Sequence, residues 1–283
     1  MPTLIDITVV IPAFNASTWI VETLRSVLEQ DAPEIEVILV DDGSTDDTAK
    51  LVTRIAENDP RLRIIGKHNT GVSDTRNAGL REAKGRYVVF LDADDVLSDG
   101  FLKTRMDFMD AHPEIDICGS DIEQLNESGT RTPTGTHAPG ENALQEILLY
   151  DPVVSSVPGN MMYRVSSLRK HDLHFETRLS SLADKYFLVC AANKGLRCAY
   201  VPGSPLYYRV HSSSMSYRLT QGIYAEDQRY VRMLIEQELI PLHIQSRVLA
   251  ANYYILAGMA RRLTCYADCV RYLVKWIHYR LVK

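Results

Sequence analysis

The first 120 residues alternate between short β-branched apolar runs and amphipathic segments, and this alternation restricts the possible folds more than any other feature. The apolar runs predict strands at 5–11, 35–40, 62–65, 87–91 and 115–118. The amphipathic segments between them predict helices at 18–29, 45–58, 73–83 and 101–111. Because parallel strands need long crossover connections, this pattern indicates an α/β fold in which a mostly parallel sheet is flanked by helices.

The rest of the chain departs from this pattern in two steps. Residues 120–140 are polar and rich in Gly and Pro, which predicts a loop or weak hairpin over the sheet rather than a domain boundary. Helices are predicted at 143–149 and 185–193, with a strand at 161–163 between them. After Gln221 all signals are helical.

Composition excludes several classes of protein. A net charge of -5, from 36 acidic and 31 basic residues, argues against nucleic acid as a partner of the whole chain. The five cysteines include no C-x-x-C pair, so neither a disulfide framework nor a structural zinc site is expected. The N-terminal residues enter a strand pattern directly, so we expect no secretory signal and a cytoplasmic setting. The longest uncharged, mostly apolar stretch, 248–260, is shorter than the roughly 20 residues of a membrane span.

Acidic clusters follow two of the predicted strands. Strand 35–40 leads into Asp41-Asp42-Gly43-Ser44-Thr45, and strand 87–91 leads into Asp92-Ala93-Asp94-Asp95. We expect these strands to be neighbours whose carboxyl ends face one crevice, where open α/β sheets bind ligands. Crowded carboxylates raise each other's pKa unless a cation compensates, so the two clusters together favour a divalent metal. Taken singly, the first cluster is also compatible with a turn that caps a helix, and the second with a solvated turn.

Four segments, in their order and spacing, resemble family 2 glycosyltransferases. They are Val10-Ile11-Pro12-Ala13-Phe14-Asn15, Val40-Asp41-Asp42-Gly43-Ser44, Asn69-Thr70-Gly71-Val72-Ser73 with Arg76-Asn77, and Leu91-Asp92-Ala93-Asp94-Asp95. The resemblance extends over about residues 5–217. It implies an inverting enzyme with a GT-A (Rossmann-like) fold.

The resemblance also implies how a nucleotide-sugar donor would bind. Pro12, Phe14 and Asp42 would border the nucleobase, with Asp42 accepting a hydrogen bond from a uracil ring. Asp92 would lie near the ribose or the metal. Asp94 would be a ligand of Mg²⁺ or Mn²⁺, and the metal would in turn hold the diphosphate.

Two basic side chains extend the predicted donor site. Breaking the bond to the nucleoside diphosphate places negative charge on the departing phosphate, which a metal and basic groups must stabilise. Arg76 follows the 71–73 turn and is a candidate for the phosphate, with pairing to a surface acid as the alternative. The segment Tyr208-Arg209-Val210-His211-Ser212-Ser213-Ser214-Met215-Ser216 resembles the family's His-x-x-Ser-x-Ser motif. By that resemblance His211 reaches the metal or the diphosphate, and the loop after it closes over the donor.

Inversion by direct displacement also needs a carboxylate that takes the proton of the acceptor hydroxyl. In the family this is the Asp of a Glu-Asp pair that opens a helix beyond the metal motif. Here Ala183 replaces the Glu, and Asp184 follows 90 positions after Asp94. We assign Asp184 as the base, with a helix cap as its alternative role and Glu176 or Asp172 as substitute bases. The missing Glu leaves open how the base is tuned.

The C-terminal region carries most of the basic charge. Residues 243–283 hold seven basic residues and one acidic residue, a net of +6, while the rest of the chain carries -11. Apolar residues recur there at helical spacing: Tyr266, Val270, Leu273, Trp276, Ile277 and Leu281. A basic amphipathic helix of this kind suits an anionic membrane interface, while packing on the protein or on a second subunit is the alternative.

The sequence thus predicts a catalytic domain over 1–220, with a nucleotide-sugar half (about 1–120) and an acceptor half (about 121–220), and a helical region over 221–283. The predicted function is metal-dependent transfer of a sugar, with UDP as the preferred carrier, to a glycan or lipid-linked acceptor of polysaccharide or lipopolysaccharide biosynthesis. Location at the cytoplasmic face of the membrane follows if the C-terminal helices bind lipid. The sugar, the acceptor and the oligomeric state are not predicted.

Two other functions remain open. Val88 to Leu97 also fits the apolar run and D-x-D-x-V-L pattern of haloacid-dehalogenase-like phosphatases, with Asp92 as nucleophile. That motif normally lies on the first strand of its fold, whereas three strand-helix units precede it here. Replacement of the family's Glu by Ala183 also makes a catalytically inactive nucleotide-sugar-binding protein conceivable.

Overall fold

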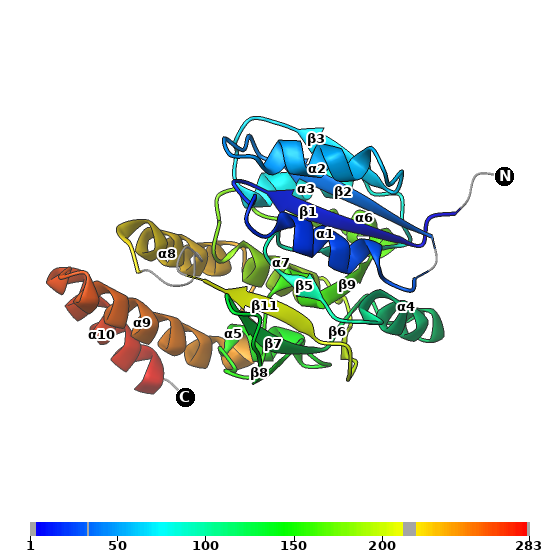
Figure 1. Cartoon of the computed structure of the whole chain (residues 1–283). Coiled ribbons are helices and arrows are strands. Elements are labelled where there is room, and N and C mark those ends of the chain that lie inside the picture. The colour runs from blue at the N-terminus through cyan, green and yellow to red at the C-terminus, as the bar shows by residue number, and fades with distance from the viewer. Residues whose placement is uncertain (1–3, 33, 212–218, 282–283) are drawn as a thin grey trace.

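The computed structural model describes residues 4–32, 34–211 and 219–281 (Figure 1). Its strands are β1 (Ile7–Ala13), β2 (Ile35–Asp41), β3 (Leu62–Gly66), β4 (Tyr87–Phe90), β5 (Val96–Leu97), β6 (Ile117–Gly119), β7 (Asp121–Asn126), β8 (Arg131–His137), β9 (Met161–Arg164), β10 (Cys198–Tyr200) and β11 (Leu206–Val210). Its helices are α1 (Ile20–Leu28), α2 (Thr48–Ala56), α3 (Val72–Glu82), α4 (Phe101–Ala111), α5 (Ala143–Leu148), α6 (Val165–Lys170), α7 (Ala183–Asn193), α8 (Gln221–Glu236), α9 (Gln245–Arg262) and α10 (Tyr266–Leu281). Two short 3₁₀ helices, η1 (Pro158–Asn160) and η3 (Leu242–Ile244), complete these elements.

The main sheet has seven strands in the order β10-β6-β9-β4-β1-β2-β3. Strands β3, β2, β1 and β4 are mutually parallel, whereas β9 runs antiparallel to both β4 and β6. The predicted α/β sheet flanked by helices is confirmed (Figure 1). The expectation that β2 and β4 are neighbours was wrong, because β1, which is buried along its whole length, lies between them and pairs with both.

The position of α3 over the sheet depends on a glycine. Gly79 faces β1 so closely that a Cβ atom there would lie 2.3 Å from Cγ1 of Val10. Only a residue without a side chain permits this approach, because real Cβ atoms do not come so near another carbon. Helix α3 also contacts β2, and its Arg76 reaches Asp92 just beyond the end of β4.

A second, four-stranded sheet has the order β5-β11-β7-β8. Its β7–β8 hairpin occupies the polar stretch for which a loop or weak hairpin was predicted. Strand β11 pairs parallel to β7 and antiparallel to β5, with Leu206 opposite Leu97. Strands β5, β10 and β11 and helix α6 were not predicted, and β5 and β10 are too short to show a periodicity. The second sheet matters for function because β11 ends immediately before His211.

The C-terminal helices share a hydrophobic core with the rest of the protein. Buried residues of α8 and α9, among them Tyr230 and Leu256, belong to the same cluster as Phe187 of α7 and Phe90 of β4. Helices α9 and α10 lie side by side at one end of the molecule (orange and red in Figure 1). The division of the chain at residue 220 therefore stays a prediction, since α8 and α9 complete the core of the preceding half.

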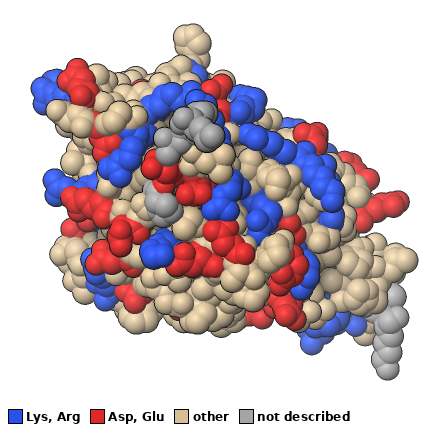
Figure 2. Space-filling view, turned by 90° about the vertical axis from the view of Figure 1, so that its right-hand side faces the viewer, with Lys and Arg blue, Asp and Glu red and all other residues tan. Residues whose placement is uncertain are grey.

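Two further observations concern the surface. Within the described ranges, no helix is both long and apolar enough to cross a membrane. On the face shown in Figure 2, acidic and basic side chains are interspersed. Such mixing is typical of a solvated protein surface rather than of a face that binds a polyanion.

Candidate active site

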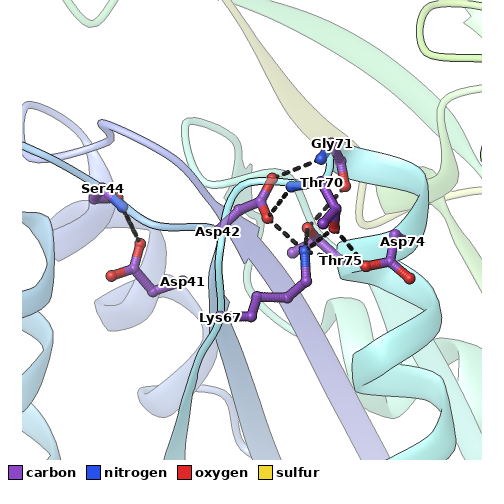
Figure 3. A network of polar contacts seen from close by, with 8 residues as sticks. All are labelled: Asp41, Asp42, Ser44, Lys67, Thr70, Gly71, Asp74 and Thr75. Atoms are coloured by element: carbon purple, nitrogen blue, oxygen red, sulfur yellow. Dashed lines mark hydrogen bonds and ion pairs between the residues drawn. The ribbon is translucent and has the colours of Figure 1, made fainter.

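Asp42 lies at the carboxyl end of β2 and is almost completely buried (Figure 3). Its Oδ1 accepts hydrogen bonds from the backbone N–H of Thr70 (2.9 Å) and from Nζ of Lys67 (2.5 Å). Its Oδ2 accepts from the backbone N–H of Gly71 (2.9 Å). A carboxylate has about four acceptor positions, so these three donors leave one for a further partner.

Lys67, which sequence reasoning missed, joins three segments at this edge of the sheet (Figure 3). It follows β3, and its ammonium group contacts Asp42, Asp74 (3.2 Å), Thr75 (3.3 Å) and the hydroxyl of Thr70. The Thr70 hydroxyl in turn donates to Asp74, and this bond is the main reason why the pKa of Asp74 is lowered. The network fixes the end of β2 against the start of α3. A basic residue directly after a parallel strand was the available sequence signal.

The other two predicted nucleobase neighbours lie at the end of β1. Pro12 is buried within the strand, while Phe14 follows it with half of its side chain exposed. The adjacent Asn15 has a positive φ of 51° and accepts a hydrogen bond from the backbone N–H of Thr45 (2.8 Å). The loops after β1 and β2 are therefore tied together, with an exposed aromatic ring beside them. An exposed aromatic face is suited to stack on a planar base.

Arg76 on α3 connects two predicted site residues that are far apart in sequence. Its Nη2 lies 2.6 Å from Asp92 Oδ1 and its Nη1 lies 2.6 Å from Asp184 Oδ1. The arginine side chain is only 3% exposed, whereas the two carboxylates remain 30% and 21% exposed. Arg76 thus pairs with acids inside the site and not with a surface acid. Its role toward a phosphate remains a prediction.

The surroundings of Asp184 raise its pKa to about 7. Burial is the largest cause of this increase. The positive charge of Arg76 lowers the pKa, whereas the negative charges of Asp92 and Glu226 raise it further. A carboxylate that titrates near neutral pH is suited to general base catalysis. Helix α7 begins at Ala183, so Asp184 occupies its second position, and the cap residue is Leu182.

The two substitute bases have less suitable environments. Glu176 forms an ion pair with Arg178 (2.9 Å), and hydrogen bonding from that guanidinium lowers the Glu176 pKa to about 2. Such a carboxylate is a weak base. Asp172 is exposed in a turn with a positive φ of 47°. These environments favour Asp184 over both.

Asp94 and His211 meet at the junction of the two sheets. The imidazole Nε2 lies 2.9 Å from Asp94 Oδ2. Arg209 on β11 secures this junction, because its backbone N–H donates to Asp95 (2.8 Å) and its Nε donates to the carbonyl oxygen of Asp94 (2.7 Å). The same guanidinium pairs with Glu22 and lies over the Trp19 ring. The loop that follows His211, at 212–218, lies outside the described residues.

The donor atoms at this junction fit a divalent metal. Burial and the nearby charge of Asp92 raise the pKa of Asp94, and burial also raises that of Asp95, whose Oδ2 is buried without a hydrogen-bond partner in the described structure. A bound cation would stabilise the ionised form of both carboxylates. Among the described residues, no three His, Cys, Asp or Glu side chains are arranged to hold a metal by themselves. One or two protein ligands are nonetheless usual for a metal that also binds substrate phosphates.

Comparisons with known proteins identify the family and the fold of this chain. A family model described as Glycosyl transferase family 2 matches residues 8–172, more than half of the chain. TarS of Staphylococcus aureus strain Mu50, a poly(ribitol-phosphate) beta-N-acetylglucosaminyltransferase, is 29% identical over 204 residues, which are 71% of this chain and 35% of TarS. ExoO of Rhizobium meliloti, a succinoglycan biosynthesis protein, is 30% identical over 226 residues, which are 75% of this chain and 62% of ExoO. The chain thus spans less than two thirds of either relative.

Solved structures show the same fold. The crystal structure of S. aureus TarS 1-349 in complex with UDP-GlcNAc matches with a TM-score of 0.69 and 23% identity, over 98% of this chain and 92% of that one. The mannosyltransferase PcManGT from Pyrobaculum calidifontis, in complex with GDP-Man and Mn²⁺, matches with a TM-score of 0.64 and 21% identity, over 100% and 82%.

The match to the family model decides between the enzyme classes that the sequence left open. The matched residues, 8–172, include β1, β2 and β3 as well as the Asp92 motif. In a phosphatase of the haloacid-dehalogenase type, the strand that leads into Asp92 would instead be the first strand of the fold. The phosphatase interpretation is therefore abandoned. The chain belongs to glycosyl transferase family 2.

Proposed function

We propose that this protein is a metal-dependent, inverting glycosyltransferase that moves a sugar from UDP to a hydroxyl group during polysaccharide biosynthesis. The observation that carries this proposal is the Asp92–Arg76–Asp184 cluster, which joins a residue of the donor motif to a carboxylate with a pKa of about 7. The names of TarS and ExoO support a glycan acceptor, and the TarS complex with UDP-GlcNAc supports a UDP-sugar donor.

The nucleobase would lie between the ends of β1 and β2. Phe14 offers an exposed ring for stacking, and Asp42 keeps one acceptor position for the N3–H of uracil. Lys67 and the two backbone N–H groups hold the Asp42 carboxylate in a fixed orientation. A rigid acceptor loses little entropy on binding, which favours selective recognition of the base.

Asp94 and His211 would hold the metal, with Mn²⁺ favoured over Mg²⁺ because imidazole nitrogen is a softer ligand than oxygen. A divalent ion bound there would stabilise the negative charge that develops on the departing diphosphate. Arg209 holds the backbone of Asp94 and so keeps its carboxylate directed toward His211. Arg76 adds positive charge beside the donor.

Asp184 would take the proton from the acceptor hydroxyl as the oxygen attacks the anomeric carbon from the face opposite the diphosphate. Its Oδ1 is held by Arg76, so Oδ2 is the atom that we assign to proton transfer. One fifth of the side chain remains exposed, which allows an acceptor to approach. The raised pKa makes the carboxylate a stronger base than an ordinary Asp.

A screen of nucleotide sugars tests the proposal. We expect the protein with Mn²⁺ to release UDP from at least one UDP-sugar, faster when an acceptor glycan is present, and to lose this activity in excess EDTA. GDP-, CMP- and dTDP-sugars should react more slowly. Absence of nucleotide release from every donor, or release that is the same in EDTA and Mn²⁺, would contradict the proposal.

We further propose that α10 attaches the enzyme to an anionic membrane. Tyr272 is the only buried residue of α10 in its described part, and one side of the helix exposes apolar residues: Tyr266, Val270, Leu273, Val274, Ile277 and Leu281. Arg271, Lys275 and Arg280 lie on the same helix. Exposed apolar area combined with positive charge favours insertion at an anionic lipid interface.

Vesicle sedimentation tests this attachment. Because Val274 is 61% exposed, Val274→Asp should leave folding intact and reduce binding to phosphatidylglycerol vesicles about tenfold by removing apolar insertion. Leu242→Asp is the matched control, since Leu242 is an exposed apolar residue in η3. Equal binding of the wild type and Val274→Asp, or a dimer that forms through α10 without lipid, would refute the membrane assignment.

A further inference from the structure

The turn before the candidate base lacks the acidic residue that the family places there. Ala183 is fully buried and apolar. Helix α7 also begins without a side-chain cap, because its cap residue is Leu182. In a capping box, an acidic residue at the third helical position would accept the N–H of the cap residue. That position is Lys185, whose ammonium group lies over the ring of Tyr150.

A carboxylate from the C-terminal region reaches this turn instead. Oε1 of Glu226, on α8, accepts hydrogen bonds from the backbone N–H of Leu182 (2.7 Å), the backbone N–H of Ser180 (2.9 Å) and the hydroxyl of Ser181 (3.0 Å). Glu226 is 9% exposed. Hydrogen bonds to an ionised, buried acceptor are stronger than those between neutral groups. The three bonds therefore fix the backbone of residues 180–182.

We propose that Glu226 is a positioning residue for Asp184, supplying from α8 the carboxylate that the sequence lacks at Ala183. The inference rests on the proposed function, because it assumes that Asp184 is the base. Leu182 and Asp184 are separated by one residue, so a shift of the turn moves the carboxylate of the base. A displacement of about 1 Å in a reacting group can cost on the order of 100-fold in rate.

The charge of Glu226 gives the role a second, electrostatic component. The charged groups that face Asp184 come from three elements besides its own: Arg76 on α3, Asp92 after β4 and Glu226 on α8, with the phenol of Tyr163 on β9 nearby. Arg76 lowers the pKa of Asp184, whereas Asp92 and Glu226 raise it. Removal of the Glu226 charge therefore lowers the pKa of the base.

The experiment compares Glu226→Ala, Glu226→Gln and a control variant, Gln237→Leu. Gln237 also joins α8 to α7, through a 2.6 Å hydrogen bond from Tyr186, but it does not touch the turn. The readouts are kcat and its pH profile for hydrolysis of UDP-GlcNAc in Mn²⁺, or of whichever nucleotide sugar the wild type hydrolyses fastest, together with UDP affinity and thermal stability.

We expect Glu226→Ala to lower kcat by about 10- to 100-fold with unchanged UDP affinity. Glu226→Gln, which keeps an acceptor oxygen, should recover part of the rate, and its acidic limb of kcat should move to lower pH. Gln237→Leu should keep the wild-type kcat and pH profile even where it is less stable. A wild-type kcat in Glu226→Ala, or an equal loss of kcat in Gln237→Leu, would overturn the proposed role of Glu226 and leave the proposed function of the enzyme unaffected. A wild type that hydrolyses no nucleotide sugar would overturn the proposed function and this inference with it.

Discussion

Asp184→Asn is expected to lower the rate of sugar transfer by about 100- to 10,000-fold, the usual contribution of a general base. The amide has the size of the carboxylate and still accepts a hydrogen bond from Arg76, so the variant should fold. Its affinity for UDP should not change, because the assigned donor contacts of Asp42, Asp94 and His211 are intact. Steady-state kinetics and UDP titration of the same preparation measure both properties.

Asp172→Asn and Glu176→Gln are the matched controls for this prediction, since they neutralise the two substitute bases. Both should retain wild-type turnover, because Asp172 is exposed and Glu176 is engaged by Arg178. The wild-type kcat/KM should fall as the pH is lowered through about 7, where Asp184 becomes protonated. Full activity of Asp184→Asn, or inactivity of either control, would assign the base elsewhere.

Arg76→Met should reduce both stability and activity. The substitution leaves the carboxylates of Asp92 and Asp184 without the cation that contacts each at 2.6 Å. Removing one partner of a buried ion pair costs about 3–5 kcal/mol, and partial exposure of the carboxylates favours the lower end of that range. We expect a loss of about 3 kcal/mol in the free energy of unfolding, measured by chemical denaturation, together with loss of sugar transfer.

The pH dependence of this loss follows from Asp184. Without Arg76 the pKa of Asp184 rises further above that of the unfolded chain, because burial and the negative charges of Asp92 and Glu226 then act unopposed. An acid whose pKa is raised by folding destabilises the folded state while it is ionised, and this penalty disappears below the folded pKa. The deficit of Arg76→Met should therefore be largest at alkaline pH, where Asp184 is ionised in both proteins, and should shrink as the pH falls to about 7, where wild-type Asp184 also becomes protonated.

Arg86→Met provides the control, because Arg86 also bridges two aspartates, Asp6 (2.8 Å) and Asp110 (2.6 Å). Its side chain is 40% exposed, so the substitution should cost no more than about 1 kcal/mol and should leave activity intact. Addition of Asp92→Asn to Arg76→Met should restore part of the stability without restoring transfer. Equal losses in the Arg76 and Arg86 variants would contradict the central position of Arg76 in the site.

The sequence predicted the elements of residues 1–120 well for a physical reason. Strands β1, β2 and β4 are buried on both faces, so each appears as a continuous apolar run. Helices with an apolar side follow β1 and β2 directly, and α4 follows β4 after the short strand β5. The two- and three-residue strands β5 and β10 were missed because they span too few residues for any period. The alternation of apolar and amphipathic segments does not determine the order of strands within a sheet, so β1 was not expected between β2 and β4.

The candidate site was predictable where its motifs are local and not where its contacts are distant. Asp92 and Asp94 lie just beyond β4, and together with the acidic residues after β2 they favoured a divalent metal. Arg76 and Asp184 are separated by 108 residues, and Glu226 lies still farther along the chain, so only tertiary structure brings the three segments together. The sequence showed that Ala183 lacks the expected carboxylate, but it contained no indication that α8 supplies one.

Calorimetric titration with UDP, performed in Mn²⁺ and again in excess EDTA, tests most directly whether the ends of β1, β2 and β4 form a metal-dependent nucleotide site. The account predicts saturable binding in Mn²⁺ that weakens at least about tenfold in EDTA and is equally weak in both conditions for Asp94→Ala. Binding that is the same with and without metal, or that persists unchanged in Asp94→Ala, would contradict it.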